Sequence, residues 1–344
     1  LAKSPNTTFI ELLEEVGVES TVDMAVRLGL RSYEDQGSFD EDNSIADYFR
    51  QNNLGAFTLG PTAVNPLELS NVGATLASGG KWCEPNPVAK VKDRLGQEVF
   101  IERPDCEEAV SPELASGLAN GMAQDTISGT AKDAAAAYGW SGPVAAKTGT
   151  TESHQSSAFL GFNNAFAAAT YIYNDGTQTT PLCSGPVRQC NYGDLFGGTE
   201  AARSWFQMAT QIPGVQGAGL PTPSPLYDPA SRNDLFDSVV GLQAAEARSQ
   251  LEAAGFKVRE TKGTATGKPE GEVVEARTAE NAGEGAVVTL VVSDGSPARN
   301  NPPNRRDTRD DRSRDDDEAS RYRDDLEDEI GRFADDLADL FGDL

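Results

Sequence analysis

Three runs between residues 144 and 173 constrain the fold more than any other part of the sequence. Val144–Thr151 begins with apolar residues, and 157–162 and 166–173 are rich in apolar and aromatic side chains. Each run has the length and composition of a β-strand, so we expect antiparallel strands here. Helical patterns precede them. This order predicts an α+β domain in which helices pack on an antiparallel sheet.

The segments before these strands carry helix signals. Apolar residues at Phe9, Leu12, Leu13 and Val16 predict a packed helix that ends at Gly17. Further helices are expected at about 20–28, 65–78, 111–123 and 200–210, a short helix is expected to begin at 129–132, and a hairpin is expected at about 88–101. By contrast, 33–53 is polar and acidic, and we expect a loop there.

The strand at 144–151 ends in residues whose side chains can bind a ligand. Thr148 and Thr150 share one face of an extended strand, whereas Lys147 and Gly149 share the other. The two hydroxyls and the positive charge suit a carboxylate ligand. Gly149 has no side chain, so a substrate backbone can lie close to it. The triplet Lys-Thr-Gly alone is weak, because it often marks only a turn.

Two further motifs accompany this triplet. The chain opens with Ser4-Pro5-Asn6 directly before a helix, and residues 59–69 run on to Ala77-Ser78-Gly79-Gly80-Lys81. In this order, the S-x-N motif, this block and K-T-G resemble class A penicillin-binding proteins. Residues 152–162 resemble the actinobacterial branch. The resemblance covers about 1–212, which we interpret as the C-terminal portion of the transpeptidase domain.

The resemblance implies a serine D,D-transpeptidase that acts on peptidoglycan stem peptides and reacts with β-lactams. It implies that Ser4 relays a proton, Asn6 binds the amide of the acyl peptide and Lys147 sets the electrostatics. It also implies that Thr148 and Thr150 hold the terminal carboxylate, next to Gly149. The backbone N–H of Thr150 would form half of an oxyanion hole. We expect neither a cofactor nor a metal.

The nucleophile of this family lies in an S-x-x-K motif at the start of a helix. The chain contains this spacing only at Ser78-Gly79-Gly80-Lys81, where two glycines disfavour a helix. We therefore reject Ser78 as the nucleophile. We expect the nucleophile, a glycosyltransferase domain and a membrane anchor to lie upstream of Leu1, and the 344 residues alone to be inactive.

Two more segments follow the predicted transpeptidase portion. Residues 213–233 are rich in Pro, Gly and Ser and are predicted to be a linker. Residues 234–296 resemble a PASTA domain, a small β-α-β-β module, but depart from its pattern at 275–285. This departure leaves two roles open, which are binding of a muropeptide and service as a spacer.

The C-terminal segment 297–344 is predicted to be a disordered acidic tail. From Asn301 onward it holds 16 acidic residues and 8 arginines. Its end differs, because apolar residues at 326, 330, 333, 337 and 340 form the narrow stripe of an amphipathic helix. Such a helix either docks on a protein partner or forms transiently without one.

Charge and cysteines indicate the compartment. The net charge of −25 argues against nucleic acid and against docking on an anionic membrane. Any membrane contact is expected only through the upstream anchor. Four cysteines allow three disulfide pairings, and the spacings favour Cys83–Cys106 and Cys183–Cys190. Disulfides imply an oxidising environment, which here is the outer face of the cell membrane. Four buried free thiols are the alternative.

Three functions remain to be compared. The first is the cross-linking part of a bifunctional cell-wall synthase. The second is a non-catalytic scaffold that recruits cell-wall partners through the PASTA-like module and the tail. The third is a secreted β-lactamase-type hydrolase, which the additional module and the tail disfavour. The residues upstream of Leu1 would separate the first two functions.

Overall fold

The computed structural model describes residues 1–151, 154–173, 195–278, 283 and 285–298. At its centre lie the strands β5 (Ala145–Thr150), β6 (Ser156–Asn163) and β7 (Phe166–Tyr173). They form an antiparallel sheet in the order β5-β6-β7, so β5 lies at one edge. In its register, Thr148 lies opposite Phe159 and Gly149 lies opposite Ala158. The three predicted strands are confirmed.

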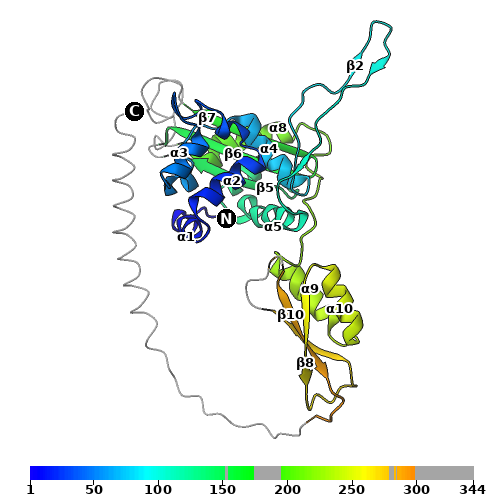
Figure 1. The fold of residues 1–344 in the computed structure, drawn as a ribbon. Helices are drawn as coiled ribbons and strands as arrows, with labels where there is room; N and C mark the ends of the chain where they lie inside the picture. Colours follow the sequence, from blue (N-terminus) through cyan, green and yellow to red (C-terminus); the bar gives the residue numbers. More distant parts are fainter. Residues whose placement is uncertain (152–153, 174–194, 279–282, 284, 299–344) are drawn as a thin grey trace. The chain divides into compact units, whose positions relative to one another are not determined.

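Helices surround this sheet on both faces (Figure 1). The first group is α1 (Asn6–Val16), α2 (Val18–Leu28), η1 (Arg31–Glu34), α3 (Ile45–Gln51), η2 (Gly55–Leu59) and α4 (Pro66–Ala77). The second group is α5 (Pro112–Met122), α6 (Asp125–Ser128), α7 (Lys132–Ala137), the π-helical turn η4 (Gly197–Ala201) and α8 (Ala202–Ala209). The α+β class predicted from the sequence is confirmed.

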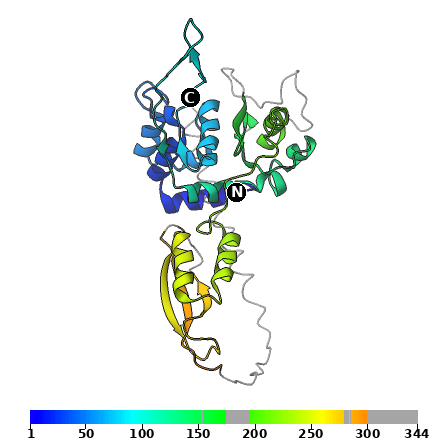
Figure 2. The same ribbon diagram turned by 90° about the vertical axis from the view of Figure 1, so that its right-hand side faces the viewer.

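Side-chain alternation along β6 divides the core into two layers. Leu160 and Phe162 point to one face, where they pack with residues of α4 and α5. Phe159 points to the other face and packs against Trp205 of α8. Gly161 lies under this tryptophan, and a Cβ atom there would come within 2.7 Å of Trp205 Cε2. Figure 2 shows the sheet between α8 and the helices coloured blue.

Local sequence signals explain where the main helices begin. Asn65 caps α4, because its side chain accepts a hydrogen bond from the Leu67 N–H, and Pro66 occupies the first turn. Ser111 caps α5 in the same way, through the Leu114 N–H. These two helices cover the inner face of the sheet and so support the strand that carries the predicted site.

The loop predicted at 33–53 is wrong in its second half, where α3 forms. Ser44 caps this helix by accepting a hydrogen bond from the Asp47 N–H. Ile45, Ala46 and Phe49 are buried, and Phe49 is fully shielded from solvent. The helix has only seven residues, so its apolar stripe is too short to stand out in an acidic segment. Tertiary burial of these three side chains therefore decides its structure.

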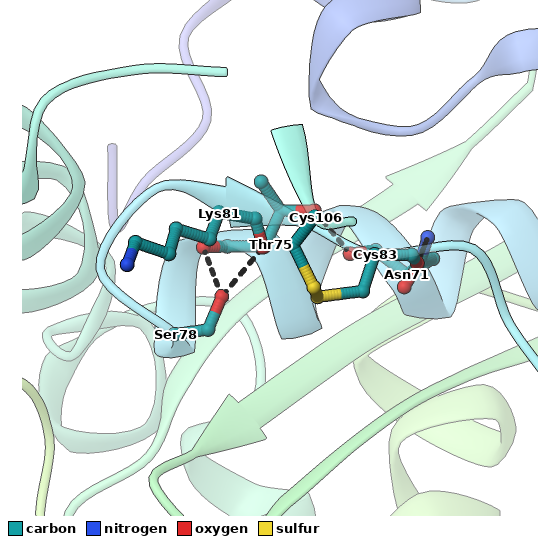
Figure 3. Close-up of a disulfide and its surroundings, with 6 residues drawn as sticks. All are labelled: Asn71, Thr75, Ser78, Lys81, Cys83 and Cys106. Carbon is teal, nitrogen blue, oxygen red and sulfur yellow. Dashed lines mark hydrogen bonds between the residues drawn. A yellow bond between two sulfur atoms is a disulfide. The ribbon is translucent and has the colours of Figure 1, made fainter. Parts of the chain in front are cut away.

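A long excursion leaves the domain between α4 and α5. Its base is formed by β1 (Lys81–Trp82) and β4 (Glu107–Glu108), which pair antiparallel. Its tip is a hairpin of β2 (Val91–Lys92) and β3 (Glu98–Val99) that projects from the domain (Figure 1). A disulfide joins Cys83 to Cys106 at the base (Figure 3). The hairpin and this pairing were both predicted, whereas Cys183 and Cys190 lie outside the described residues.

We expect replacement of both Cys83 and Cys106 by serine to lower the free energy of unfolding by up to about 3 kcal/mol. The bond closes a loop with a sequence separation of 23 residues, and it restricts the unfolded chain. Urea unfolding of both proteins, with and without reductant, measures the effect. Reductant should lower the free energy of unfolding of the parent protein by breaking this bond, an effect that the double variant cannot show. Equal stabilities of the two oxidised proteins would contradict the prediction.

The C-terminal described segment is a small α/β unit. It contains α9 (Pro229–Val239), α10 (Ala244–Ala253), β8 (Lys257–Gly263), β9 (Val273–Arg277) and β10 (Val287–Ser293). The strand order is β8-β10-β9, with β8 parallel and β9 antiparallel to β10. Leu251, Val273 and Leu290 are fully buried between helices and sheet. Helix α9 stands where the predicted β-α-β-β order places its first strand, and a β-bridge pairs Gln243 with Glu272.

Helix α9 was not predicted, although its signal is present. Asp228 caps it by accepting a hydrogen bond from the Ser231 N–H, and Pro229 is its first residue. The linker-like composition of 213–233 obscured this signal. The amphipathic helix predicted near 326–340 lies outside the described residues. Within the described ranges, no helix has the length and apolar character needed to cross a lipid bilayer.

Candidate active site

The structure brings Ser4 and Lys147 together across a sequence separation of 143 residues. The Lys147 ammonium donates hydrogen bonds to Ser4 Oγ at 2.6 Å and to the Thr148 carbonyl oxygen at 2.7 Å. A lysine has three N–H donors, so one is left over from these two bonds for a ligand. Because Ser4 Oγ accepts from Lys147, the Ser4 hydroxyl proton is directed elsewhere. The pair is therefore arranged so that the serine can exchange a proton with a third group.

The open edge of β5 adds backbone groups to the site. The Thr151 N–H donates to the Ser156 carbonyl oxygen, so the backbone N–H of residue 151 points towards β6. Backbone groups alternate along an antiparallel strand, and the N–H groups of Thr148 and Thr150 therefore point away from β6. They face the free edge of the described sheet. An extended peptide can pair with this edge by strand addition.

The two threonine hydroxyls on the other face of β5 have different partners. Thr148 Oγ1 lies 2.6 Å from Thr130 Oγ1. Thr150 Oγ1 accepts a hydrogen bond from the Gly197 N–H at 3.0 Å. Gly197 packs directly on the strand, since a Cβ atom there would lie 2.4 Å from the Gly149 carbonyl oxygen. The turn η4 thus fixes the end of β5 that carries Thr150.

The S-x-N segment places Ser4 in an unusual backbone conformation. Ser4 has φ +50°, a left-handed value that is uncommon for residues other than glycine. Pro5 follows it with φ −73° and starts α1, of which Asn6 is the first residue. Asn6 is exposed, and among the described residues its side chain makes no hydrogen bond to the other predicted site residues. The strained Ser4 points its hydroxyl at Lys147.

Burial changes the acidity of Lys147. Removal of this side chain from water disfavours its charged form and lowers the pKa of the ammonium below 10.5, while the negative charge of Asp125 partly opposes this effect. The ammonium is therefore closer to releasing a proton than a lysine in water. A lysine in this state can hold a negative charge and also take part in proton exchange with Ser4.

Sequence reasoning missed Asp125 and Thr130. Asp125 is only 2% exposed, and its Oδ1 atom accepts hydrogen bonds from both the N–H and the hydroxyl of Thr130. Gly129 permits this contact, because a Cβ atom there would lie 2.5 Å from Asp125 Oδ1. The only signal was Gly129-Thr130-Ala131, which we interpreted as the start of a helix. Nothing in the linear pattern connects these residues with Thr148.

A cavity of about 240 Å³ lies beside the same end of β5. Gly149, Ser156 and Tyr171 line it from the sheet, and Tyr33 and Leu69 line it from the helices. A Cβ atom at Gly149 would meet only Ala158 Cβ, at 3.8 Å. Gly149 therefore leaves space next to the strand for a ligand group.

Ser78, the serine of the single S-x-x-K spacing, lies at the C-terminal end of α4 (Figure 3). Its hydroxyl interacts with the carbonyl oxygens of Thr75 and Lys81, at 3.0 and 2.7 Å. Gly79 and Gly80 then turn the chain with φ +74° and +82°. A hydroxyl bound to one carbonyl at the end of α4 and one in β1 has a structural role and is not an activated nucleophile, which supports the rejection of Ser78.

Comparison with known proteins identifies two families in the chain. Residues 1–182, just over half of the chain, match the penicillin binding protein transpeptidase domain, and residues 237–294 match the PASTA domain. Penicillin-binding protein 1A of Aquifex aeolicus is 26% identical over 175 residues, which are 51% of this chain and 21% of that protein. Penicillin-binding protein 1A of Neisseria meningitidis serogroup B is 27% identical over 229 residues, 65% of this chain and 25% of that protein.

Among solved structures, the penicillin-binding protein PonA1 from Mycobacterium tuberculosis has a TM-score of 0.48 at 17% identity, covering 62% of this chain and 55% of that one. The chain spans about a fifth to a quarter of the length of the curated relatives described above. The match over residues 1–182 decides the family. The chain belongs to the penicillin-binding protein transpeptidase family and carries a PASTA domain.

Proposed function

We propose that this chain carries the substrate-binding part of a serine D,D-transpeptidase that cross-links peptidoglycan stem peptides. One observation carries the proposal, which is the 2.6 Å hydrogen bond from Lys147 to Ser4 Oγ at the free edge of β5. It unites a proton-exchanging serine, a cation with a lowered pKa and a strand edge that can pair with a peptide. An acyl-transfer site requires these three parts.

The residues take the following roles in this proposal. The peptide pairs with β5, and its terminal carboxylate binds Lys147, Thr148 and Thr150. The oxyanion of the tetrahedral intermediate accepts a hydrogen bond from the Thr150 N–H. Ser4 passes a proton to the departing D-alanine amine and later takes one from the attacking amine. Asn6 binds the amide of the acyl peptide.

A nucleophilic serine completes this chemistry, and none of the described residues is placed to act as one. We propose that it belongs to a longer polypeptide, with a glycosyltransferase domain and a membrane anchor, at the outer face of the cell membrane. Its hydroxyl attacks the D-Ala-D-Ala carbonyl, D-alanine leaves, and an amine of a second stem peptide then displaces the serine. The 344 residues alone would neither react with penicillin nor turn over substrate.

The other segments have auxiliary roles in this proposal. The PASTA domain either binds a muropeptide or acts as a spacer, and the tail offers its C-terminal residues to a protein partner. A second candidate function is a scaffold that retains the fold without the nucleophile and recruits cell-wall partners through these segments. The departure of 275–285 from the PASTA pattern favours the spacer role.

Fluorescent-penicillin labelling of native membranes tests the proposal. An antibody against residues 301–344 captures the protein, and preincubation with unlabelled penicillin is the control. We expect a labelled band well above the 36.5 kDa of this chain, and no labelling of the purified 344-residue chain. An unlabelled captured band would favour the scaffold. A labelled band at 36.5 kDa would make Ser78 or Ser4 the nucleophile.

A further inference from the structure

A buried carboxylate lies behind the hydroxyls of the candidate site. Asp125 is 2% exposed, and Oδ1 accepts the Thr130 hydroxyl at 2.6 Å and the Thr130 N–H at 2.7 Å. Its other oxygen, Oδ2, is buried and has no hydrogen-bond partner among the described residues. Burial of an unpaired carboxylate is costly, and the two bonds at Oδ1 stabilise it. Asp125 therefore constrains the Thr130 hydroxyl strongly.

The supply of protons fixes the direction of the neighbouring hydrogen bond. A hydroxyl carries one proton, and a carboxylate only accepts. A hydrogen bond to an ionised oxygen is roughly twice as strong as one between neutral groups, so the Thr130 proton goes to Asp125. In the 2.6 Å contact between Thr130 Oγ1 and Thr148 Oγ1, Thr148 must then be the donor. The Thr148 proton consequently points away from the site.

Thr150 has the opposite polarity. Its oxygen accepts a hydrogen bond from the Gly197 N–H, which uses a lone pair and leaves its proton available. Two threonines on the same face of one strand thus present different groups, an acceptor at Thr148 and a donor at Thr150. Only the donor suits a carboxylate without rearrangement.

We propose that Asp125 is a positioning residue that acts through Thr130 to turn the Thr148 hydroxyl away from an incoming carboxylate. The carboxylate binds Lys147 and Thr150 first, and it gains Thr148 only if the bond from Thr148 to Thr130 breaks. This inference rests on the proposed function, because it assumes a carboxylate ligand at β5. It adds a residue pair that tunes how strongly the site prefers a carboxylate.

The substitution Thr130→Val tests this direction. Valine is similar in shape but has no hydroxyl, so Thr148 loses its acceptor and can donate to the ligand. Thr130 is exposed, so the domain should remain folded. We measure the rate constants of acylation by penicillin G and by its methyl ester in the native polypeptide that contains this chain. We expect the ratio of the acid to the ester rate constant to rise about tenfold, as for one hydrogen bond to a charged group.

Three further variants separate the direction of the hydrogen bond between Thr148 and Thr130 from the packing at residue 130 and the charge of residue 125. Thr130→Ser keeps the hydroxyl and should retain the parent ratio. Asp125→Asn keeps an oxygen that accepts both bonds from Thr130 but removes the negative charge that acts on Lys147, so its ratio measures the effect of this charge alone. Asp125→Ala removes this acceptor as well, lets Thr130 donate to Thr148, and should raise the ratio above that of Asp125→Asn. A purely structural role would lower both rate constants together and leave their ratio unchanged.

Each outcome decides between the two claims. A ratio that stays equal or falls in Thr130→Val, while the parent protein is acylated, overturns the inference and leaves the proposed function intact. A parent protein that reacts with neither compound overturns the proposed function, and the inference with it. Three results together support the inference: a rise in Thr130→Val, a rise in Asp125→Ala beyond that of Asp125→Asn, and the parent ratio in Thr130→Ser.

Discussion

Replacement of Trp205 by alanine should lower the free energy of unfolding of the transpeptidase domain by about 3–5 kcal/mol. Trp205 has no exposed surface, and its ring centroid lies 5.1–5.7 Å from those of Trp140, Phe159, Phe166 and Phe206. Its indole N–H interacts with the carbonyl oxygens of Gly161 and Ala168, in β6 and β7. The substitution leaves a cavity against the sheet and removes these bonds.

Urea unfolding followed by near-ultraviolet circular dichroism measures this loss. Met208 lies on the same helix and is 39% exposed, so Met208→Ala provides a matched control. Surface substitutions usually change stability by about 0.5 kcal/mol or less, and we expect a small effect there. A Trp205→Ala variant as stable as the Met208→Ala variant would show that α8 does not anchor the sheet.

Replacement of Lys147 by methionine should reduce the rate constant of acylation by penicillin at least about 100-fold in the native polypeptide, the effect of losing one preorganised donor. Methionine is similar in length but has no charge and no donor. The variant loses the hydrogen bond to Ser4 Oγ and the cation that faces the carboxylate. Stopped-flow acylation with a fluorescent penicillin measures the rate. Lys132→Met, at an exposed lysine of α7, is the matched control and should react like the parent.

The free energy of unfolding of Lys147→Met shows whether a slower acylation comes from the lost side-chain function or from an unfolded domain. Burial lowers the pKa of Lys147 below 10.5, so the folded protein binds fewer protons than the unfolded chain between the lowered pKa and 10.5. The contribution of this group to stability therefore rises with pH through that window, and the charged form costs stability at neutral pH. Lys147→Met removes this cost, which offsets its lost hydrogen bonds. An unfolded variant, or one that reacts like the parent, would contradict the assigned role.

Several parts of the fold could be predicted because their signals are local. The caps at Asn65 and Ser111 and the alternation along β6 each depend on residues a few positions apart. Helix α3 was not predicted, because a helix of seven residues shows too little of the apolar helical repeat to be recognised in an acidic segment. Helix α9 was not predicted, because its cap at Asp228 lies in a segment with the composition of a linker.

The sequence by itself determined the extended strand at 144–151, the motifs with Ser4 and Lys147, the disulfide of Cys83 and Cys106, and the family. These features are encoded by residue type and by short spacing. Only the tertiary structure decided that Ser4 Oγ accepts from Lys147, and that Asp125 reaches Thr148 through Thr130. Contacts between distant segments depend on how helices pack on the two faces of the sheet, and no linear pattern records this packing.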